Sequence, residues 1–223
     1  YYHPSNSYIY LYGNMDMEEK LAFLDEHYLS HFDYLDVDSV IQEQKAFGAC
    51  QDVTLEYPVA ENEGEEDNTY LSYNMVVGNA ADSQMAMAFE VLDYALLSAP
   101  GAPLKQALLD VKAGKDVYGS YDDGILQPYF TVIAKGSNPD RKEEFVSVIR
   151  QVLGDIVKNG IDKKAVEAGI NYFEFRYREA DFSSYPKGLM YSLDILGDWL
   201  YEKGNPFAQV QQLTVFEKLK KAV

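Results

Sequence analysis

Cysteine, tryptophan, histidine and long apolar runs are scarce in this 223-residue sequence, and each scarcity narrows what the protein can be. Cys50 is the single cysteine, so no internal disulfide can form. A lone thiol fits a reducing compartment and predicts a cytoplasmic location, with an organelle matrix as the alternative. We interpret Cys50 as a small buried apolar residue, because no histidine lies near it in sequence. No run of about 18 apolar residues occurs, so we expect no membrane-spanning helix and no membrane partner.

Positive charge is also scarce. The chain has 19 Lys and Arg residues against 36 Asp and Glu residues, and its net charge is −17. Residues 1–67 hold most of this excess, with 16 acidic and 2 basic residues. Phosphate recognition needs clustered Lys and Arg, so nucleic acid is excluded as a partner. Long-range attraction would favour basic peptides, although composition by itself is explained better by plain solubility.

The few histidines determine whether the chain can form a hydrolytic zinc site. His27 and His31 are four residues apart, a spacing that places two ligands on one face of a helix. Hydrolytic zinc motifs also place a glutamate base between the histidines, as H-E-x-x-H or H-x-x-E-H. Residues 27–31 read H-Y-L-S-H, and Ser30 occupies the base position of the inverted form. We therefore expect a polar helix face here, with no metal ligand and no catalytic residue in the chain.

Other motifs that carry chemistry are missing from the sequence. There is no G-x-S-x-G nucleophile motif and no glycine-rich phosphate loop. Tyr8, Tyr10 and Tyr12 alternate along one segment. They could form an aromatic row that faces a ligand, but the simpler interpretation is that they pack in a sheet. The segment 70–77 has the pattern of a strand to which an extended peptide could pair, if it lies at a sheet edge.

Hydrophobic periodicity and capping residues predict an α+β fold, a mostly antiparallel sheet packed against helices with a C-terminal run of helices. Asp16, Asp82 and Asn138 are the expected N-caps, with Pro139 at the first position of its helix. The expected strands are 7–12, 53–57, 71–77, 116–121 and 129–134, the last two joined through Asp123-Gly124. The expected helices begin near residues 16, 82, 104, 139, 163, 186 and 209.

Three segments describe the expected domain organisation. Residues 1–35 are expected to be the C-terminal end of a preceding domain, which the resemblance given below implies is the catalytic one, because two elements cannot bury their faces alone. Residues 36–51 form a linker, and residues 52–223 form a second, non-catalytic α+β domain. A start at Tyr1 rather than Met leads us to expect that the chain has been cut from a longer protein.

Several short stretches, in order along nearly the whole chain, carry a family resemblance. They are Tyr1 to Ser7 with Tyr12-Gly13-Asn14, Leu96 to Leu108, Pro128 to Gly136, Phe173 to Glu179 and Pro186 to Leu189. Together they resemble the presequence protease and falcilysin branch of the insulinase (pitrilysin) family of zinc metallopeptidases. The resemblance identifies the chain as an internal fragment of such an enzyme.

The resemblance implies a zinc metalloendopeptidase that closes like a clamshell around unstructured peptide substrates. Zinc would be bound by an H-x-x-E-H motif upstream of Tyr1, and no catalytic residue of the family can be carried onto a position here. The fragment would then form part of the chamber wall and be inactive alone, with its substrate-binding residues unspecified. Two alternatives stay open: a scaffold or processing-complex subunit that binds partners without cleaving, and a metal-binding module that uses His27 and His31.

Overall fold

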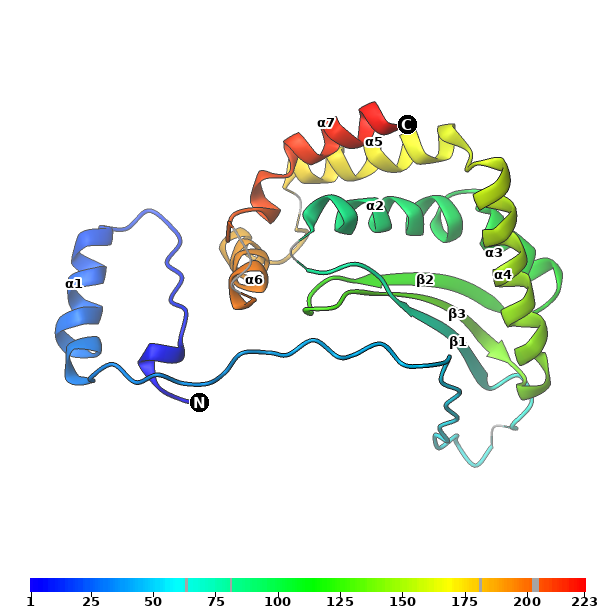
Figure 1. Cartoon of the computed structure of the whole chain (residues 1–223), viewed down its shortest axis with the longest axis horizontal. Helices are drawn as coiled ribbons and strands as arrows, with labels where there is room; N and C mark the ends of the chain where they lie inside the picture. Colours follow the sequence, from blue (N-terminus) through cyan, green and yellow to red (C-terminus); the bar gives the residue numbers. More distant parts are fainter. Residues whose placement is uncertain (63, 81, 181, 202–204) are drawn as a thin grey trace. The chain divides into compact units, whose positions relative to one another are not determined.

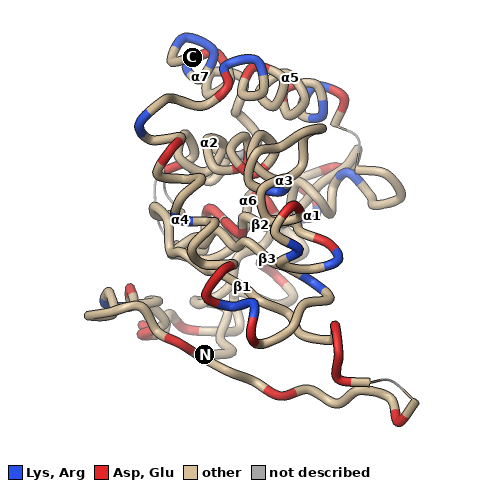
Figure 2. The backbone as a smooth tube through the Cα atoms, turned by 90° about the vertical axis from the view of Figure 1, so that its right-hand side faces the viewer, with Lys and Arg blue, Asp and Glu red and all other residues tan. Residues whose placement is uncertain are grey.

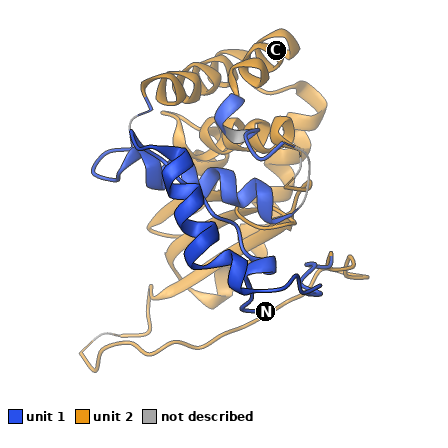
Figure 3. Ribbon diagram, turned by 90° about the vertical axis from the view of Figure 1, so that its left-hand side faces the viewer, with its two compact units in different colours: residues 1–42, 180–211 blue, residues 43–179, 212–223 orange. Residues whose placement is uncertain are grey.

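The computed structural model describes residues 1–62, 64–80, 82–180, 182–201 and 205–223. The chain divides into two compact units, coloured separately in Figure 3. Unit 1 consists of residues 1–42 and 180–211, and unit 2 of residues 43–179 and 212–223. The chain therefore leaves unit 2 after residue 179 and returns to it at residue 212.

A three-stranded antiparallel sheet forms the centre of unit 2 (Figure 1). Its strands are β1 (Thr69–Val76), β2 (Asp116–Asp122) and β3 (Tyr129–Ser137), in the order β1-β3-β2. The register places Leu71 and Val117 on either side of Ala134. The hairpin predicted through Asp123-Gly124 and the strand predicted near 71–77 are both confirmed.

Helices α2 (Ser83–Asp93), α3 (Pro103–Asp110) and α4 (Lys142–Asn159) cover one face of this sheet, and a π-helical turn (Tyr94–Ser98) continues α2. Helices α5 (Lys163–Glu179) and α7 (Leu213–Ala222) pack on α2 as an outer layer (Figure 1). Asp82 caps α2 as predicted, since its side chain accepts a hydrogen bond from the backbone N–H of Met85. Gly160 ends α4 at φ 86°, a left-handed conformation that glycine adopts readily.

One predicted cap is confirmed in its position, with Asn138 before Pro139, but not in its hydrogen bond. Pro139 begins a 3₁₀ turn that precedes α4, and the side chain of Asn138 does not cap it. Asn138 instead binds Asp67, at the end of the acidic loop. Its Nδ2 donates to Asp67 Oδ1 and its Oδ1 accepts from the Asp67 backbone N–H, both at 2.8 Å. The tertiary partner supplies two hydrogen bonds where a cap would supply one.

Two apolar clusters hold unit 2 together and confirm the α+β class. The first lies between the sheet and helices α3 and α4, and includes Leu71, Val117, Val132, Leu104, Leu108, Phe145 and Ile149. The second lies among helices α2, α5 and α7, and includes Met87, Val91, Val166, Ile170, Val215 and Phe216. Burial of apolar area at about 25 cal/mol per Å² makes these clusters the main source of stability.

Unit 1 is built around α1 (Met17–His27) and α6 (Lys187–Leu200). The predicted N-cap of α1 is confirmed, because Asp16 Oδ1 accepts from the Glu19 backbone N–H at 3.1 Å. The predicted strand at 7–12 is wrong, since this segment joins no sheet. Its rings pack on α6 instead, Tyr8 on Trp199 at 4.7 Å and Tyr12 on Tyr191 at 6.1 Å. The rings of Tyr8 and Tyr12 thus contact a helix rather than a neighbouring strand, and both side chains stay exposed.

Two further predictions fail in unit 2. The segment 53–57 has no regular secondary structure and pairs with no strand in the described part of the chain, since alternation by itself does not supply a partner strand. Cys50 is exposed rather than buried, since it lies in the irregular stretch that precedes this segment. None of the described helices has the length and hydropathy needed to cross a membrane.

Candidate functional site

The two histidines of the candidate zinc pair do not share a helix. Helix α1 ends at His27, and Tyr28 breaks the helical backbone with φ −138°. His31 lies in a separate 3₁₀ turn, Leu29–His31. The His27 ring packs on Phe23, with ring centroids 4.6 Å apart. The spacing of four therefore does not place both imidazoles on one helical face.

The metal that the family implies does not fit the residues present. Within the described ranges, no three side chains of His, Cys, Asp or Glu are grouped so that they could hold a metal ion. Hydrolysis on zinc needs at least three protein ligands with an open position for water. No catalytic step can therefore be assigned through zinc on these residues.

The second face of the sheet is the most distinctive surface of unit 2. Cross-strand pairs place alternate residues of the three strands on this side, opposite the face that packs on the helices. We define the open sheet face as Tyr70, Ser72, Asn74, Tyr118, Ser120 and Lys135, all of which are exposed. The face carries aromatic, hydroxyl and amide groups, which can donate and accept hydrogen bonds and stack on a ligand.

Two contacts order this face. Thr131 Oγ1 donates to Asn74 Oδ1 at 2.8 Å, which fixes the amide between β3 and β1. The Lys135 ammonium lies over the Tyr70 ring, 5.9 Å from its centroid. A cation over an aromatic ring stabilises by about 0.5–1 kcal/mol at an exposed site. The side chains are thus partly held in place before any ligand arrives.

Carboxylates flank the open sheet face at both ends of β2. The Lys105 ammonium donates to Asp116 Oδ1 at 3.2 Å and lowers the pKa of that carboxyl. The Tyr129 hydroxyl donates to Asp122 Oδ2 at 3.1 Å, and this hydrogen bond to the carboxylate raises the pKa of Tyr129. The lowered pKa keeps Asp116 ionised at neutral pH, so this end of β2 adds negative charge to the rim of the face.

A hollow of about 240 Å³ lies at the β1 end of this face. Its lining comes from residues 57–60, from Asp67, Asn68 and Tyr70, and from Lys135 and Gly136. The rings of Tyr57 and Tyr70 meet nearly edge to face at 5.9 Å. The hollow is therefore aromatic on one side and charged on the other.

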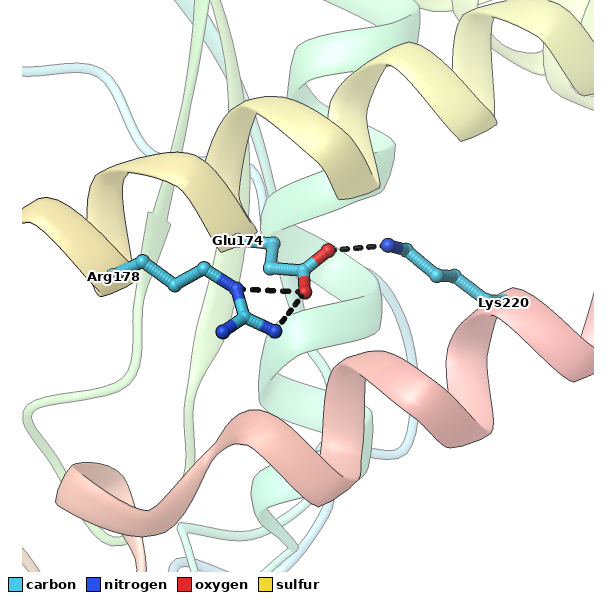
Figure 4. Close-up of polar contacts among 3 residues, drawn as sticks. All are labelled: Glu174, Arg178 and Lys220. Carbon is cyan, nitrogen blue, oxygen red and sulfur yellow. Dashed lines mark hydrogen bonds and ion pairs between the residues drawn. The ribbon is translucent and has the colours of Figure 1, made fainter.

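An ion-pair cluster links helices α5 and α7 (Figure 4), and it holds these helices together rather than forming a site for chemistry. Glu174 on α5 accepts from Arg178 Nη2 at 2.7 Å and also from Lys220 Nζ on α7. The two cations, Lys220 first, lower the pKa of Glu174. The Gln212 backbone N–H donates to the Tyr177 hydroxyl at 3.3 Å, a second polar link between the end of α5 and the start of α7. These contacts close the chain back onto unit 2.

The fold and the open face define a class of protein: an α+β domain with a covered and an open sheet face, and no grouped metal ligands among its described residues. Residues 1–173 match the family model described as "Peptidase M16 inactive domain". The chain therefore belongs to the M16 peptidase family, within the part of it described as inactive. The predicted kinship with insulinase-type and presequence-protease-like peptidases is confirmed.

Curated relatives are much longer than this chain. It is 45% identical to "Protein HypA" of Clostridium perfringens over all of its length, which is 23% of that protein. It is 31% identical to "Presequence protease 1, chloroplastic/mitochondrial" of Arabidopsis thaliana over 99% of its length, 21% of that protein. A crystal structure described as a zinc protease from Bordetella pertussis shares the fold at TM-score 0.52 and 11% identity, covering 69% of this chain and 80% of that one.

The open sheet face was only partly visible in the sequence. The alternation at 70–77 indicates that one side of β1 is polar, but it does not show which strands lie beside it. Tyr118, Ser120 and Lys135 join Tyr70 and Ser72 only because β3 lies between β1 and β2. The missing signal was strand order, which pattern alone does not supply.

Proposed function

We propose that this chain is a non-catalytic wall of the peptide chamber in a zinc metalloendopeptidase that degrades unstructured peptides. The match of residues 1–173 to a peptidase domain described as inactive carries this proposal. The name of the plant relative, a presequence protease, supports peptides as the substrate class. The open sheet face would be the surface turned toward substrate, since it can hydrogen-bond and stack without offering a nucleophile.

Charge favours basic peptides as substrates. Figure 2 shows the acidic residues spread along the chain, and the stretch up to residue 67 is the most acidic. Asp116 and Asp122 add negative charge beside the open sheet face. Negative potential at a cleft raises the local concentration of cationic ligands and falls with ionic strength. We propose no role for nucleic acid or a membrane.

Domain roles and compartment are part of the same proposal. Residues 1–35 would end the catalytic domain, residues 36–51 would link it to the next, and residues 52–223 would form the second domain. Zinc would be bound outside this chain, in the rest of the enzyme. The relatives named mitochondrial or chloroplastic support an organelle matrix as an alternative to the cytoplasm.

The test uses the full enzyme and a matched pair of substitutions. Ser72 lies on the open sheet face, whereas Ser147 is an exposed residue of α4. Ser72→Arg should raise KM for basic peptides by about 3- to 10-fold through bulk and like charge, with zinc content unchanged. Ser147→Arg should leave KM unchanged. Peptide cleavage should be abolished by a chelator.

Two results would overturn the proposal. Equal kinetics for Ser72→Arg and Ser147→Arg would remove substrate from the open sheet face. A full-length protein that cleaves no peptide but still binds partners would favour the scaffold alternative, in which the same fold acts without hydrolysis. Cleavage by the 223-residue chain alone would contradict its non-catalytic role.

A further inference from the structure

The hollow at the β1 end of the open sheet face has one wall from residues 57–60 and another from the approach to β1 and the end of β3. The Tyr57 hydroxyl donates to the Asn68 carbonyl, and this hydrogen bond links the two walls. The volume of about 240 Å³ is below the ~300–1,000 Å³ that sites for drug-sized ligands have. The hollow therefore fits one amino-acid residue rather than a whole cofactor.

The carboxylate in this lining is already neutralised. Asn138 Nδ2 donates to Asp67 Oδ1 at 2.8 Å, and Lys115 Nζ lies 3.3 Å from Asp67 Oδ2. The hydrogen bond from Asn138, followed by the contact with Lys115, lowers the pKa of Asp67. Both oxygens of Asp67 thus have partners, and a cationic ligand would gain little from this carboxylate.

The ammonium in the lining, that of Lys135, is in a different situation. It is exposed and lies 5.9 Å from the centroid of the Tyr70 ring, and it has no ion-pair partner among the described residues. The acid opposite it in the sheet register, Asp116, forms its ion pair with Lys105. An ammonium carries three N–H donors and attracts anions. The charge that the hollow offers to a ligand is therefore positive.

The rest of the lining is largely apolar. The rings of Tyr57 and Tyr70 meet nearly edge to face at 5.9 Å, and residues 58–60 are proline, valine and alanine. Such walls favour a ligand group that buries aromatic or aliphatic area. A carboxylate joined directly to an apolar side chain matches both parts of the hollow, and the C-terminal residue of a peptide has this chemistry.

We propose that the hollow binds the C-terminal residue of a peptide, with its carboxylate on Lys135 and an aromatic or aliphatic side chain on the two tyrosine rings. For the class of ligand, this inference rests on the proposed function. The rest of the peptide would lie over the adjoining open sheet face, where basic residues meet the negative charge of Asp116. Hydrolysis of a peptide bond creates a new C-terminal carboxylate, so substrates and products would both carry the recognised group.

Equilibrium binding of two probes to the intact 223-residue chain tests this proposal. The probes are one basic decapeptide that ends in phenylalanine, prepared as the free acid and as the C-terminal amide and labelled with fluorescein at the N-terminus. Fluorescence anisotropy should give a dissociation constant about fivefold lower for the acid than for the amide, since ammonium and carboxylate form a charge-assisted hydrogen bond. The preference should shrink at 0.5 M NaCl.

Three variants assign the preference to one side chain. Lys135→Gln keeps the length of the side chain but removes its charge, and should bring the ratio of the two dissociation constants to about one. Lys135→Arg keeps the charge and should keep the preference for the acid. Lys158→Gln removes the same charge from an exposed residue of α4 and should bind both probes as the wild type does. Thermal unfolding of each variant checks that the fold is retained.

Three outcomes would overturn the proposal. Wild-type chain that binds acid and amide equally has no site for the carboxylate. A preference for the acid that persists in Lys135→Gln places the carboxylate elsewhere. Displacement of the acid probe by acetate at the concentration of the probe would show that the hollow binds any small anion.

Cleavage assays of the full-length enzyme separate this inference from the proposed function. A preference for the acid that depends on Lys135, in a full-length protein that cleaves no peptide, supports the site in the hollow and overturns the chamber role. Peptide cleavage by the full-length enzyme, with equal binding of acid and amide by the wild-type chain, overturns the site and supports the chamber role.

Discussion

The carboxyl group of Asp93 on α2 packs directly over the backbone of Gly119 on β2. A β-carbon built on Gly119 would collide with Asp93 Oδ1 and with Leu97. Asp93 Oδ1 is buried and has no hydrogen-bond partner among the described residues, and Ser98 Oγ donates to Oδ2 at a long 3.4 Å. Helix α2 therefore approaches β2 this closely only because residue 119 is a glycine. The approach also takes Asp93 Oδ1 away from water without giving it a hydrogen bond from the described residues in return.

Gly119→Ala should destabilise unit 2 by about 1–3 kcal/mol, because the added methyl group forces α2 and its π-helical turn away from β2. Urea unfolding followed by far-ultraviolet circular dichroism measures the change. Gly154→Ala is the control: nothing lies within 4 Å of its added β-carbon, so the helix α4 should gain about 0.5–1 kcal/mol. An unchanged stability for Gly119→Ala would show that the strand shifts freely.

Asp93→Asn should change how stability depends on pH. Burial raises the pKa of Asp93, so the folded state holds this proton more tightly than the unfolded state. The contribution to stability is complete below the unfolded pKa and is lost as pH rises through the folded pKa. The variant lacks this loss and should equal or exceed the wild type at pH 7, as measured by urea unfolding between pH 4 and pH 8.

Asp116→Asn provides the opposite sign in the same experiment. The hydrogen bond from Lys105 lowers the pKa of Asp116, so its contribution is present above the unfolded pKa and is lost as pH falls through the folded pKa. This variant should therefore be no more stable than the wild type at pH 7 and should converge with it in acid. If both variants were more stable than the wild type at pH 7, the assignment of Asp116 would be wrong, and if both were less stable, that of Asp93 would be wrong.

Glu174→Gln should weaken the return of α7 to α5. Loss of the carboxylate removes the charge that Lys220 and Arg178 share, which we expect to cost about 1 kcal/mol at low salt and less at 0.5 M NaCl. Because the pKa of Glu174 is lowered in the fold, the difference from the wild type should shrink as pH falls. Glu144→Gln, which breaks an exposed pair with Arg141, is the control and should cost less than about 0.5 kcal/mol.

His27→Ala should leave zinc affinity unchanged. His27 and His31 lie on separate helical turns, and among the described residues neither belongs to a group of ligands that could hold a metal. Isothermal titration of wild type and variant with zinc alone measures this, and both should bind weakly. A stoichiometric, tight site that disappears in His27→Ala would revive the independent metal module.

The sequence determined the elements that depend on local chemistry and on periodic burial. Asp16 and Asp82 cap their helices because a carboxylate accepts from an N–H three residues on, whatever else surrounds it. Glycine at position 160 and the stripe Phe145–Ile149 likewise marked α4 and its buried face. The ordered family motifs indicated the peptidase kinship that the comparisons confirmed.

Only the tertiary structure decided which surfaces meet. The alternation of Tyr8–Tyr12 and of Val53–Tyr57 is the same signal, yet the first packs on a helix and the second lies beside an unpaired edge. Asn138 is of a residue type that commonly caps helices, but its side chain binds Asp67, 71 residues away. Alternation records which side chains should be buried and not what buries them, because the partner lies far along the chain and its position is fixed by packing.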